Sequence, residues 1–228
     1  MVDIIYQDDH LVAINKPTGL AVHRSYRVAD AEIFALQLVR DAVGRRVNLV
    51  HRLDRKTSGV LLFSFDKITT QLVQKAFVDR EVGKRYIAIV RGFITEAQQI
   101  DYPLRSESGN LQNAVSNVYP ICKTEIAVPF GKWPTSRYSL VEVIPTTGRL
   151  HQIRRHLAHI NHPIIGDRPH GCNKQNRLFK ERWNMTEMLL HASELSLSHP
   201  HTGNSIVLKA PPLNTFTNMM TALGLRSN

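Results

Sequence analysis

An aspartate surrounded by cations is the first candidate for chemistry in this sequence. Asp54 stands in the segment HRLDRKTSG of residues 51–59. Its basic neighbours there are His51, Arg52, Arg55 and Lys56. Nearby positive charge favours the ionised form of a carboxylate. An ionised, positioned carboxylate can act as a nucleophile, a base or an ion-pair partner. From charge alone, a structural salt bridge at a turn is the simpler interpretation.

A cationic turn and helix form the second candidate, in the segment TTGRLHQIRRHL of residues 146–157. Apolar residues at 150, 153, 157 and 160 predict a core-facing stripe, whereas His151, Arg155 and His159 follow another face at steps of four. Arg149 opens the helix, where a guanidinium gains nothing from the helix dipole. We therefore expect a carboxylate or a phosphate as its partner, the alternative being a solvent-facing arginine.

A tyrosine at the start of a strand is the third candidate. Tyr86 follows Lys84 and Arg85 and precedes the apolar run of residues 87–90. An aromatic ring beside basic residues can stack on a nucleobase. Packing within a sheet is the alternative, and it is the more common role for a single tyrosine.

Histidine is concentrated in one segment, because five of the eleven histidines fall within residues 151–170, with Cys172 nearby. Their spacing matches neither H-E-x-x-H nor paired C-x-x-C motifs, and carboxylates are sparse there, so no metal site is predicted. G-x-G-x-x-G, G-x-x-x-x-G-K-[ST] and G-x-S-x-G are absent from the chain. Dinucleotide, P-loop and serine-hydrolase functions therefore lack sequence support.

The charge of the chain indicates a polyanionic partner. The 228 residues include 29 Lys and Arg against 19 Asp and Glu, a net charge of +10. Residues 149–182 contain eight of these cations and only two acidic residues, Asp167 and Glu181. Nucleic acid is the expected partner ahead of an anionic membrane, and a solvated basic face is the alternative. With no secretory signal, no long apolar run and two cysteines, a cytoplasmic protein is expected.

The elements that must position these residues are mostly strands. Strands are predicted at 4–6, 11–15, 60–65, 86–90, 137–143, 189–197 and 205–209, with a strand or loop at 48–53. Helices are predicted at 30–43, capped by Asp30, and at 68–78, 150–160 and 213–223. Helices do not alternate regularly with strands. We therefore expect an α+β fold, with a central mixed or mostly antiparallel sheet and flanking helices, in a single domain over residues 1–228.

Five motifs in a fixed order together resemble the RluA-type pseudouridine synthases. They are NKPTG at 15–19, HRLD with TSG at 51–59, KRY at 84–86, TGR with HQIR at 147–154, and LLHA at 189–192. The resemblance covers residues 4 to 212. It implies the pseudouridine synthase catalytic fold, and we expect no S4-type RNA-binding domain ahead of it.

Within this family the sequence is most similar to the TruC-like branch, which modifies uridine 65 of tRNA. The supporting segments are VHRS at 22–25, RRHLAH at 154–159, HPIIGD at 162–167 and HG at 170–171. Residues 172–177 keep only part of the branch pattern. A tRNA substrate is therefore expected, with ribosomal RNA as the alternative.

The resemblance also assigns roles to the candidate residues. Asp54 would be the nucleophile, attacking the base or the sugar, and Arg149 would pair with it. Tyr86 would stack on the target uracil, and Arg52 would fill the gap that the flipped nucleotide leaves. The other expected RNA contacts are Arg55, Lys84, His151, Arg154 and Arg155. The reaction would need no cofactor and no metal, and a monomer is expected.

Two functions of other classes stay open at this point. A non-catalytic RNA-binding protein on the same fold would account for the net charge and for the basic helix. A histidine-rich metal hydrolase would account for the cluster of histidines at residues 151–170.

Overall fold

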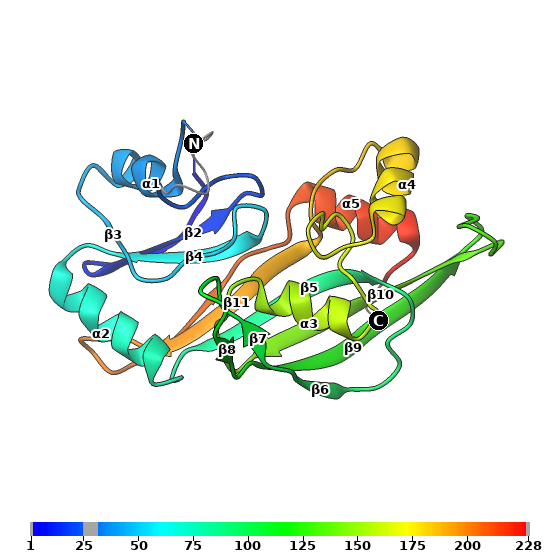
Figure 1. The fold of residues 1–228 in the computed structure, drawn as a ribbon. Helices are drawn as coiled ribbons and strands as arrows, with labels where there is room; N and C mark the ends of the chain where they lie inside the picture. The colour runs from blue at the N-terminus through cyan, green and yellow to red at the C-terminus, as the bar shows by residue number, and fades with distance from the viewer. Residues whose placement is uncertain (1, 25–31, 227–228) are drawn as a thin grey trace. The chain divides into compact units, whose positions relative to one another are not determined.

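The computed structural model describes residues 2–24 and 32–226, and its contacts divide the chain into two compact units (Figure 1). The first unit comprises Met1–Lys84 and Ala192–Pro212, and the second comprises Arg85–His191 and Leu213–Asn228. Two of the three boundaries fall inside strands, β5 (Gly83–Arg91) and β11 (Leu190–Ser198), and the third lies between Pro212 and Leu213. The organisation of residues 1–228 as a single domain stays a prediction.

The first unit is built on strands in the order β1-β2-β4-β11, with β12 beside β11 and β3 beside β4. These are β1 (Ile4–Gln7), β2 (Leu11–Lys16), β3 (Asn48–Leu49), β4 (Ser58–Ser64) and β12 (Ser205–Lys209). Its helices are α1 (Ala35–Val43) and α2 (Lys67–Val78). Every residue of β2 and β4 is buried, as expected for strands that are covered on both faces.

The second unit is built on strands in the order β5-β10-β9-β6. These are β6 (Gln98–Asp101), β9 (Val115–Ile126) and β10 (Ser136–Pro145), with a separate hairpin of β7 (Leu104–Arg105) and β8 (Leu111–Gln112). Its helices are α3 (Gln152–His159), α4 (Asn173–Trp183) and α5 (Asn214–Leu223).

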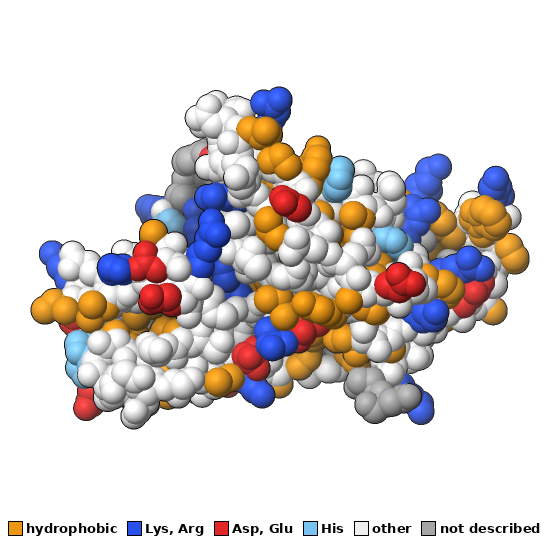
Figure 2. Space-filling view, turned by 90° about the horizontal axis from the view of Figure 1, so that it is seen from below, with side chains coloured by type: hydrophobic (Ala, Val, Ile, Leu, Met, Phe, Trp, Pro, Cys, Tyr) orange, Lys and Arg blue, Asp and Glu red, His pale blue; other side chains and the backbone are white. Residues whose placement is uncertain are grey.

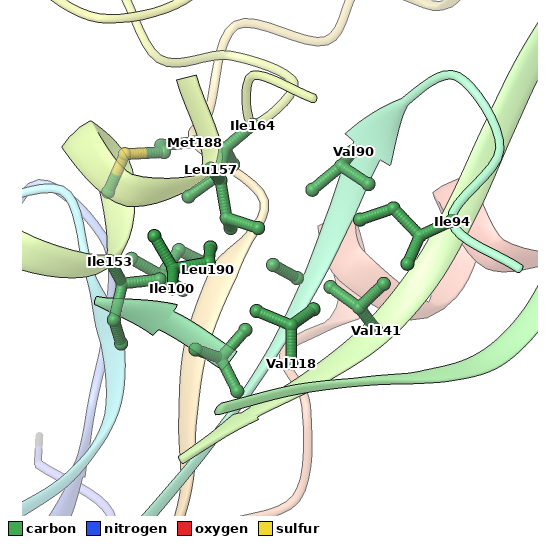
Figure 3. Packing of buried hydrophobic residues seen from close by; sticks show 12 residues of the cluster. Val90, Ile94, Ile100, Val118, Val141, Ile153, Leu157, Ile164, Met188 and Leu190 are labelled. Carbon is green, nitrogen blue, oxygen red and sulfur yellow. The ribbon is translucent and has the colours of Figure 1, made fainter. Parts of the chain in front are cut away.

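Side-chain alternation along β5 and β10 sends apolar groups to two separate cores of the second unit. Ile153 and Leu157 of α3 pack in one cluster with Val90 and Val141, as Figure 3 shows. Neighbouring residues on the same strands, which point to the opposite face, form another cluster with α4 and α5. The strands contribute Ile89, Tyr138 and Leu140, and the helices contribute Phe179, Phe216 and Met219. This part of the sheet therefore has helices on both faces, and α3 is fixed by its apolar stripe.

The expected mixed or mostly antiparallel sheet with flanking helices is confirmed. Antiparallel pairs dominate it and include β1–β2, β2–β4, β5–β10 and β9–β10. The first helix begins at Ala35, after an N-cap at Phe34 that makes no side-chain cap. Asp30, expected as its cap, lies outside the described residues. Strands β6 to β9 and helix α4 were not predicted. Among the described residues, no helix has both the length and the apolar character that crossing a bilayer requires.

Candidate active site

Asp54 lies half-buried in the loop between β3 and β4, and its backbone begins a tight turn. Its carbonyl oxygen accepts a hydrogen bond from the Thr57 amide at 3.0 Å, with Arg55 and Lys56 at the turn positions. A hydrogen bond from the carbonyl of the first residue to the amide of the fourth closes a β-turn. The carboxylate is therefore presented from an ordered turn.

The segment Asn15–Gly19 at the end of β2 holds this turn from the other side. The Gly19 amide donates to the Arg55 carbonyl at 2.9 Å, and Arg55 Nε returns a hydrogen bond to the Gly19 carbonyl at 3.0 Å. The Thr18 hydroxyl donates to the Lys56 carbonyl at 2.8 Å. Two motifs separated by about forty residues of sequence are thus one structural feature within the first unit.

Lys16 is fully buried beneath the Asp54 turn. Its ammonium group donates to the carbonyls of Pro17, Leu20 and Arg55 at 2.8, 3.0 and 3.1 Å. Burial lowers the pKa of Lys16 to about 7, and the charge of Asp54 acts in the opposite direction. Lys16 was not predicted as a site residue; a lysine that ends an apolar strand immediately before a proline was the available signal.

His51 is a support for the loop and remains neutral. Its Nε2 accepts a hydrogen bond from the Leu62 amide at 3.0 Å, and its ring stacks on Phe77 with 4.9 Å between centroids. Burial, followed by the charge of Lys84, lowers the pKa of His51 to about 3. His51 therefore contributes no positive charge beside Asp54 at neutral pH.

Gly59, in the same motif, marks a close approach of two strands. Its φ of 109° lies in a region that L side chains rarely adopt, and a Cβ there would lie 2.1 Å from the Ala192 carbonyl oxygen. Only glycine fits this position without moving the backbone. The TSG part of the motif thus serves the packing of β4 on β11.

Tyr86 belongs to the second unit and lies on β5, paired with Val143 of β10. It is half-buried and packs against the apolar cluster that contains Ile153 and Leu157. Arg85, the preceding residue, is exposed and donates to Glu142 at 2.8 Å. The structure therefore fixes the Tyr86 ring by packing on one side of the sheet.

The turn that carries Arg149 is organised by a buried glutamine. Gln152 Oε1 accepts hydrogen bonds from the Thr147 hydroxyl at 2.7 Å and the Arg149 amide at 3.0 Å. Its amide nitrogen donates to the Val115 carbonyl and to the Ser116 hydroxyl at 2.9 and 3.0 Å. Arg149 Nε donates to the Asn113 carbonyl at 3.1 Å. The TGR and HQ motifs are therefore parts of one network.

The expected RNA contacts on α3 divide into surface and buried residues. His151 has a φ of 54°, unusual for a non-glycine residue, and its Nδ1 lies 3.0 Å from His170 Nε2. Arg155 is half-buried and donates to the Arg105 carbonyl at 2.9 Å.

Arg154 is the buried residue of this set. It is buried and forms two hydrogen bonds of 2.8 Å with the buried carboxylate of Asp167. The pair joins α3 to the segment that follows it, and an RNA contact by Arg154 stays a prediction.

The histidines of residues 151–170 do not form a metal cluster among the described residues. His156 is buried, with Nδ1 beside the Ser116 hydroxyl and Nε2 beside the Tyr102 carbonyl, each at 3.0 Å. Burial lowers the pKa of His156, which suits a neutral ring that donates to a carbonyl and accepts from a hydroxyl. His159 stacks on Tyr102 with 3.7 Å between centroids.

Basic and aromatic side chains also meet on the arm formed by β9 and β10. Arg91 lies over the Phe130 ring at 5.4 Å, and Arg137 lies over Phe93 at 5.2 Å. Trp133, between the two strands, is exposed. Figure 2 shows apolar and Lys/Arg side chains gathered at the end of this arm, on the right of the view. Such a surface combines the charge and the stacking groups that nucleic acids bind.

A family model described as RNA pseudouridylate synthase matches residues 10–159. The tRNA pseudouridine synthase C of Vibrio cholerae is 44% identical over 221 residues, covering 92% of this chain and 91% of the relative. The protein of the same name from Salmonella typhi is 43% identical over 237 residues, covering 99% of this chain and 91% of the relative.

Two solved structures agree with this assignment. Human RNA Pseudouridylate Synthase Domain Containing 4 is 27% identical, with a TM-score of 0.74 over 97% of this chain and 93% of that one. Human RNA Pseudouridylate Synthase Domain Containing 1, at 20% identity and a TM-score of 0.75, covers 100% of this chain and 96% of that one, and it shows the fold alone. The matched family model and the close relatives together show that the chain belongs to the RNA pseudouridylate synthase family.

Proposed function

We propose that this chain is a tRNA pseudouridine synthase and that its target is uridine 65. The observation that carries the proposal is 44% identity to a tRNA pseudouridine synthase C over 92% of the chain. The ordered turn around Asp54 supports it, because nucleophilic chemistry requires a positioned carboxylate. Ribosomal RNA is the alternative substrate.

The reaction rearranges one nucleotide without adding or removing atoms. The C1′–N1 bond of uridine breaks, a C1′–C5 bond forms on the same uracil, C5 loses its proton and N1 gains one. No electrons are transferred and no water is consumed, so the chemistry calls for neither a redox cofactor nor a hydrolytic metal.

Asp54 is the proposed nucleophile and would attack either the base or the sugar of the target nucleotide. Lys16 lies in the same unit, where burial lowers the pKa of its ammonium group and the charge of Asp54 raises it. Arg149 is the proposed ion-pair partner of Asp54. Its turn is ordered by Gln152, which limits the positions that the guanidinium can reach.

Tyr86 is the proposed stacking partner of the target uracil and assists removal of the C5 proton. Because the Tyr86 ring is already packed, it loses little conformational entropy when a base binds. Arg52, which is exposed, is proposed to occupy the gap that the flipped uridine leaves in the RNA stack.

RNA backbone binding is proposed for five further basic side chains. These are Arg55, Lys84, His151, Arg154 and Arg155, of which Arg154 also pairs with Asp167. Neutralising several phosphates makes affinity fall steeply with salt. We further propose that the enzyme acts as a monomer in the cytoplasm.

The test is site-resolved pseudouridine mapping of total RNA from cells with and without the gene. Loss of pseudouridine at position 65 of tRNA, restored by the wild-type chain, is the expected result. Loss at a ribosomal site instead would move the substrate to ribosomal RNA. An unchanged map, together with tRNA binding by the purified protein, would replace the enzyme with a non-catalytic RNA-binding protein.

A further inference from the structure

Three turns of the first unit bring two histidines and one carboxylate together. His10 lies in the turn between β1 and β2, Asp66 precedes α2, and His201 lies in the turn between β11 and β12. One ligand atom from each lies within 4.8 Å of the other two. Over the part of the chain that the structure describes, this is the one group of three or more such residues with this geometry.

A buried histidine and an aspartate hold two of these turns in place. Asp8 Oδ1 accepts hydrogen bonds from the His10 and Leu11 amides, both at 2.7 Å. His199 Nδ1 accepts from the amides of His201 and Thr202 at 3.2 and 3.1 Å. His199 Nε2 therefore carries the proton, and it donates to Asp8 Oδ2 at 3.1 Å. The backbones of His10 and His201 are thus tied to each other through Asp8 and His199.

The side chains of the cluster are also ordered. The rings of His10 and His201 stack with 3.8 Å between centroids and 21° between planes. The hydroxyl of buried Thr69 donates to Asp66 Oδ2 at 2.6 Å and lies 2.7 Å from His201 Nε2. The Asp66 carboxylate also accepts from the Thr69 amide at 2.8 Å. Hydrogen bonds from a neighbouring side chain, such as those of Thr69 here, orient metal ligands in known sites.

We propose that His10, Asp66 and His201 bind one divalent transition-metal ion, with Zn²⁺ the ion of choice. Imidazole nitrogen and carboxylate oxygen are typical zinc ligands at about 2.0–2.2 Å, which places tetrahedral donors roughly 3.4 Å apart. Ligand atoms within 4.8 Å of one another reach this spacing after side-chain shifts on the order of 1 Å. Water would complete the tetrahedron.

The chemistry of the donor set excludes the common hard cations. Mg²⁺ and Ca²⁺ prefer six or more oxygen ligands, whereas two imidazoles favour zinc and its neighbours in the first transition row. His10 is half-buried, and Asp66 and His201 are exposed, so a solvated ion has direct access. A bound ion would link three turns of the first unit and stabilise it against unfolding.

The test is calorimetric titration of the full chain, stripped of metal with a chelator, using Zn²⁺ alone as the probe. One Zn²⁺ per chain is expected, with affinity reduced at least tenfold in His10→Ala, His201→Ala and Asp66→Asn. His170→Ala is the matched control, because it removes a close histidine pair outside the proposed site and should leave the affinity unchanged.

Thermal unfolding separates loss of the site from loss of the fold. Asn also caps helices well, so Asp66→Asn should melt near the wild type in chelator, and only the wild type should gain stability when Zn²⁺ is added. The proposal is overturned if wild type and Asp66→Asn respond equally to Zn²⁺, if no stoichiometric binding occurs, or if His170→Ala abolishes binding.

Discussion

Lys16 in the first unit and Arg154 in the second are both buried cations, but they have different partners. Arg154 forms a bidentate pair with Asp167, and the two charges neutralise each other. Lys16 instead donates to three backbone carbonyls, whose dipoles solvate the charge without cancelling it. A guanidinium stays protonated in proteins, whereas burial lowers the pKa of Lys16 to about 7.

This difference separates permanent from adjustable support. The Arg154–Asp167 pair joins α3 to the loop that follows it at any physiological pH. Lys16, beneath the Asp54 turn, instead binds or releases its proton near neutrality.

Breaking the Arg154–Asp167 pair should lower the free energy of unfolding the most. Asp167→Asn leaves the Arg154 guanidinium buried without a counter-charge, which typically lowers the free energy of unfolding by about 3–5 kcal/mol. Urea unfolding at pH 7 measures the loss. A decrease below about 1 kcal/mol would show that solvent reaches Arg154 and that the pair is not permanent support.

Removing the Lys16 ammonium group should lower the free energy of unfolding by a smaller amount. Lys16→Met keeps much of the side-chain volume and leaves three carbonyls without their donor, so we expect a loss of about 1–3 kcal/mol in unfolding free energy. Urea unfolding checks this value. Lys67→Met, at an exposed lysine of α2, is the control and should change stability by no more than about 0.5 kcal/mol. Equal losses in both variants would remove the special role of Lys16.

The pH dependence of stability distinguishes the two cations directly. Between pH 7 and 10 the unfolded chain keeps a proton on Lys16 that the folded chain has released, so stability due to this group rises with pH and is lost as the pH falls toward 7. The slope cannot exceed about 1.4 kcal/mol per pH unit. Unfolding curves from pH 7 to 10 should be steeper in wild type and Arg154→Met than in Lys16→Met, which keeps only the slope from groups such as Lys84.

Substitution of His51 should change the free energy of unfolding the least. Its folded-state pKa, lowered to about 3 from an ordinary 6.5, means that its contribution to stability is present above pH 6.5 and is lost as the pH falls toward 3. His51→Gln keeps an acceptor for the Leu62 amide and should cost roughly 0.5–1.5 kcal/mol at pH 7. The difference from wild type should shrink as the pH falls; a difference that stays constant would contradict a neutral, buried ring.

The strands and helices with clear apolar periodicity were predictable from the sequence, and so was the family. The 98–126 region was missed because β9 alternates half-exposed and exposed positions along most of its length, and Pro120 lies at its register shift. Helix α4 was missed because it is rich in charge and buries only Gln175 and Phe179. Neither element has the continuous apolar pattern that single-sequence reasoning detects.

The order of the motifs identified the residues that could do chemistry, but it could not separate surface cations from buried ones. Arg154 and Arg155 are adjacent in the sequence, and only packing shows that the first is paired with Asp167. The role of Lys16 and the cluster of His10, Asp66 and His201 depend on contacts between distant segments, which have no local sequence pattern.

The central claim is that Asp54 carries out the isomerisation of a tRNA uridine. Purified wild type, Asp54→Asn and the control Asp41→Asn, at an exposed carboxylate on α1, should be incubated with unmodified tRNA and mapped for pseudouridine. Full conversion at position 65 is expected from wild type and Asp41→Asn, with no product from Asp54→Asn despite retained tRNA binding. Wild-type turnover by Asp54→Asn would contradict it.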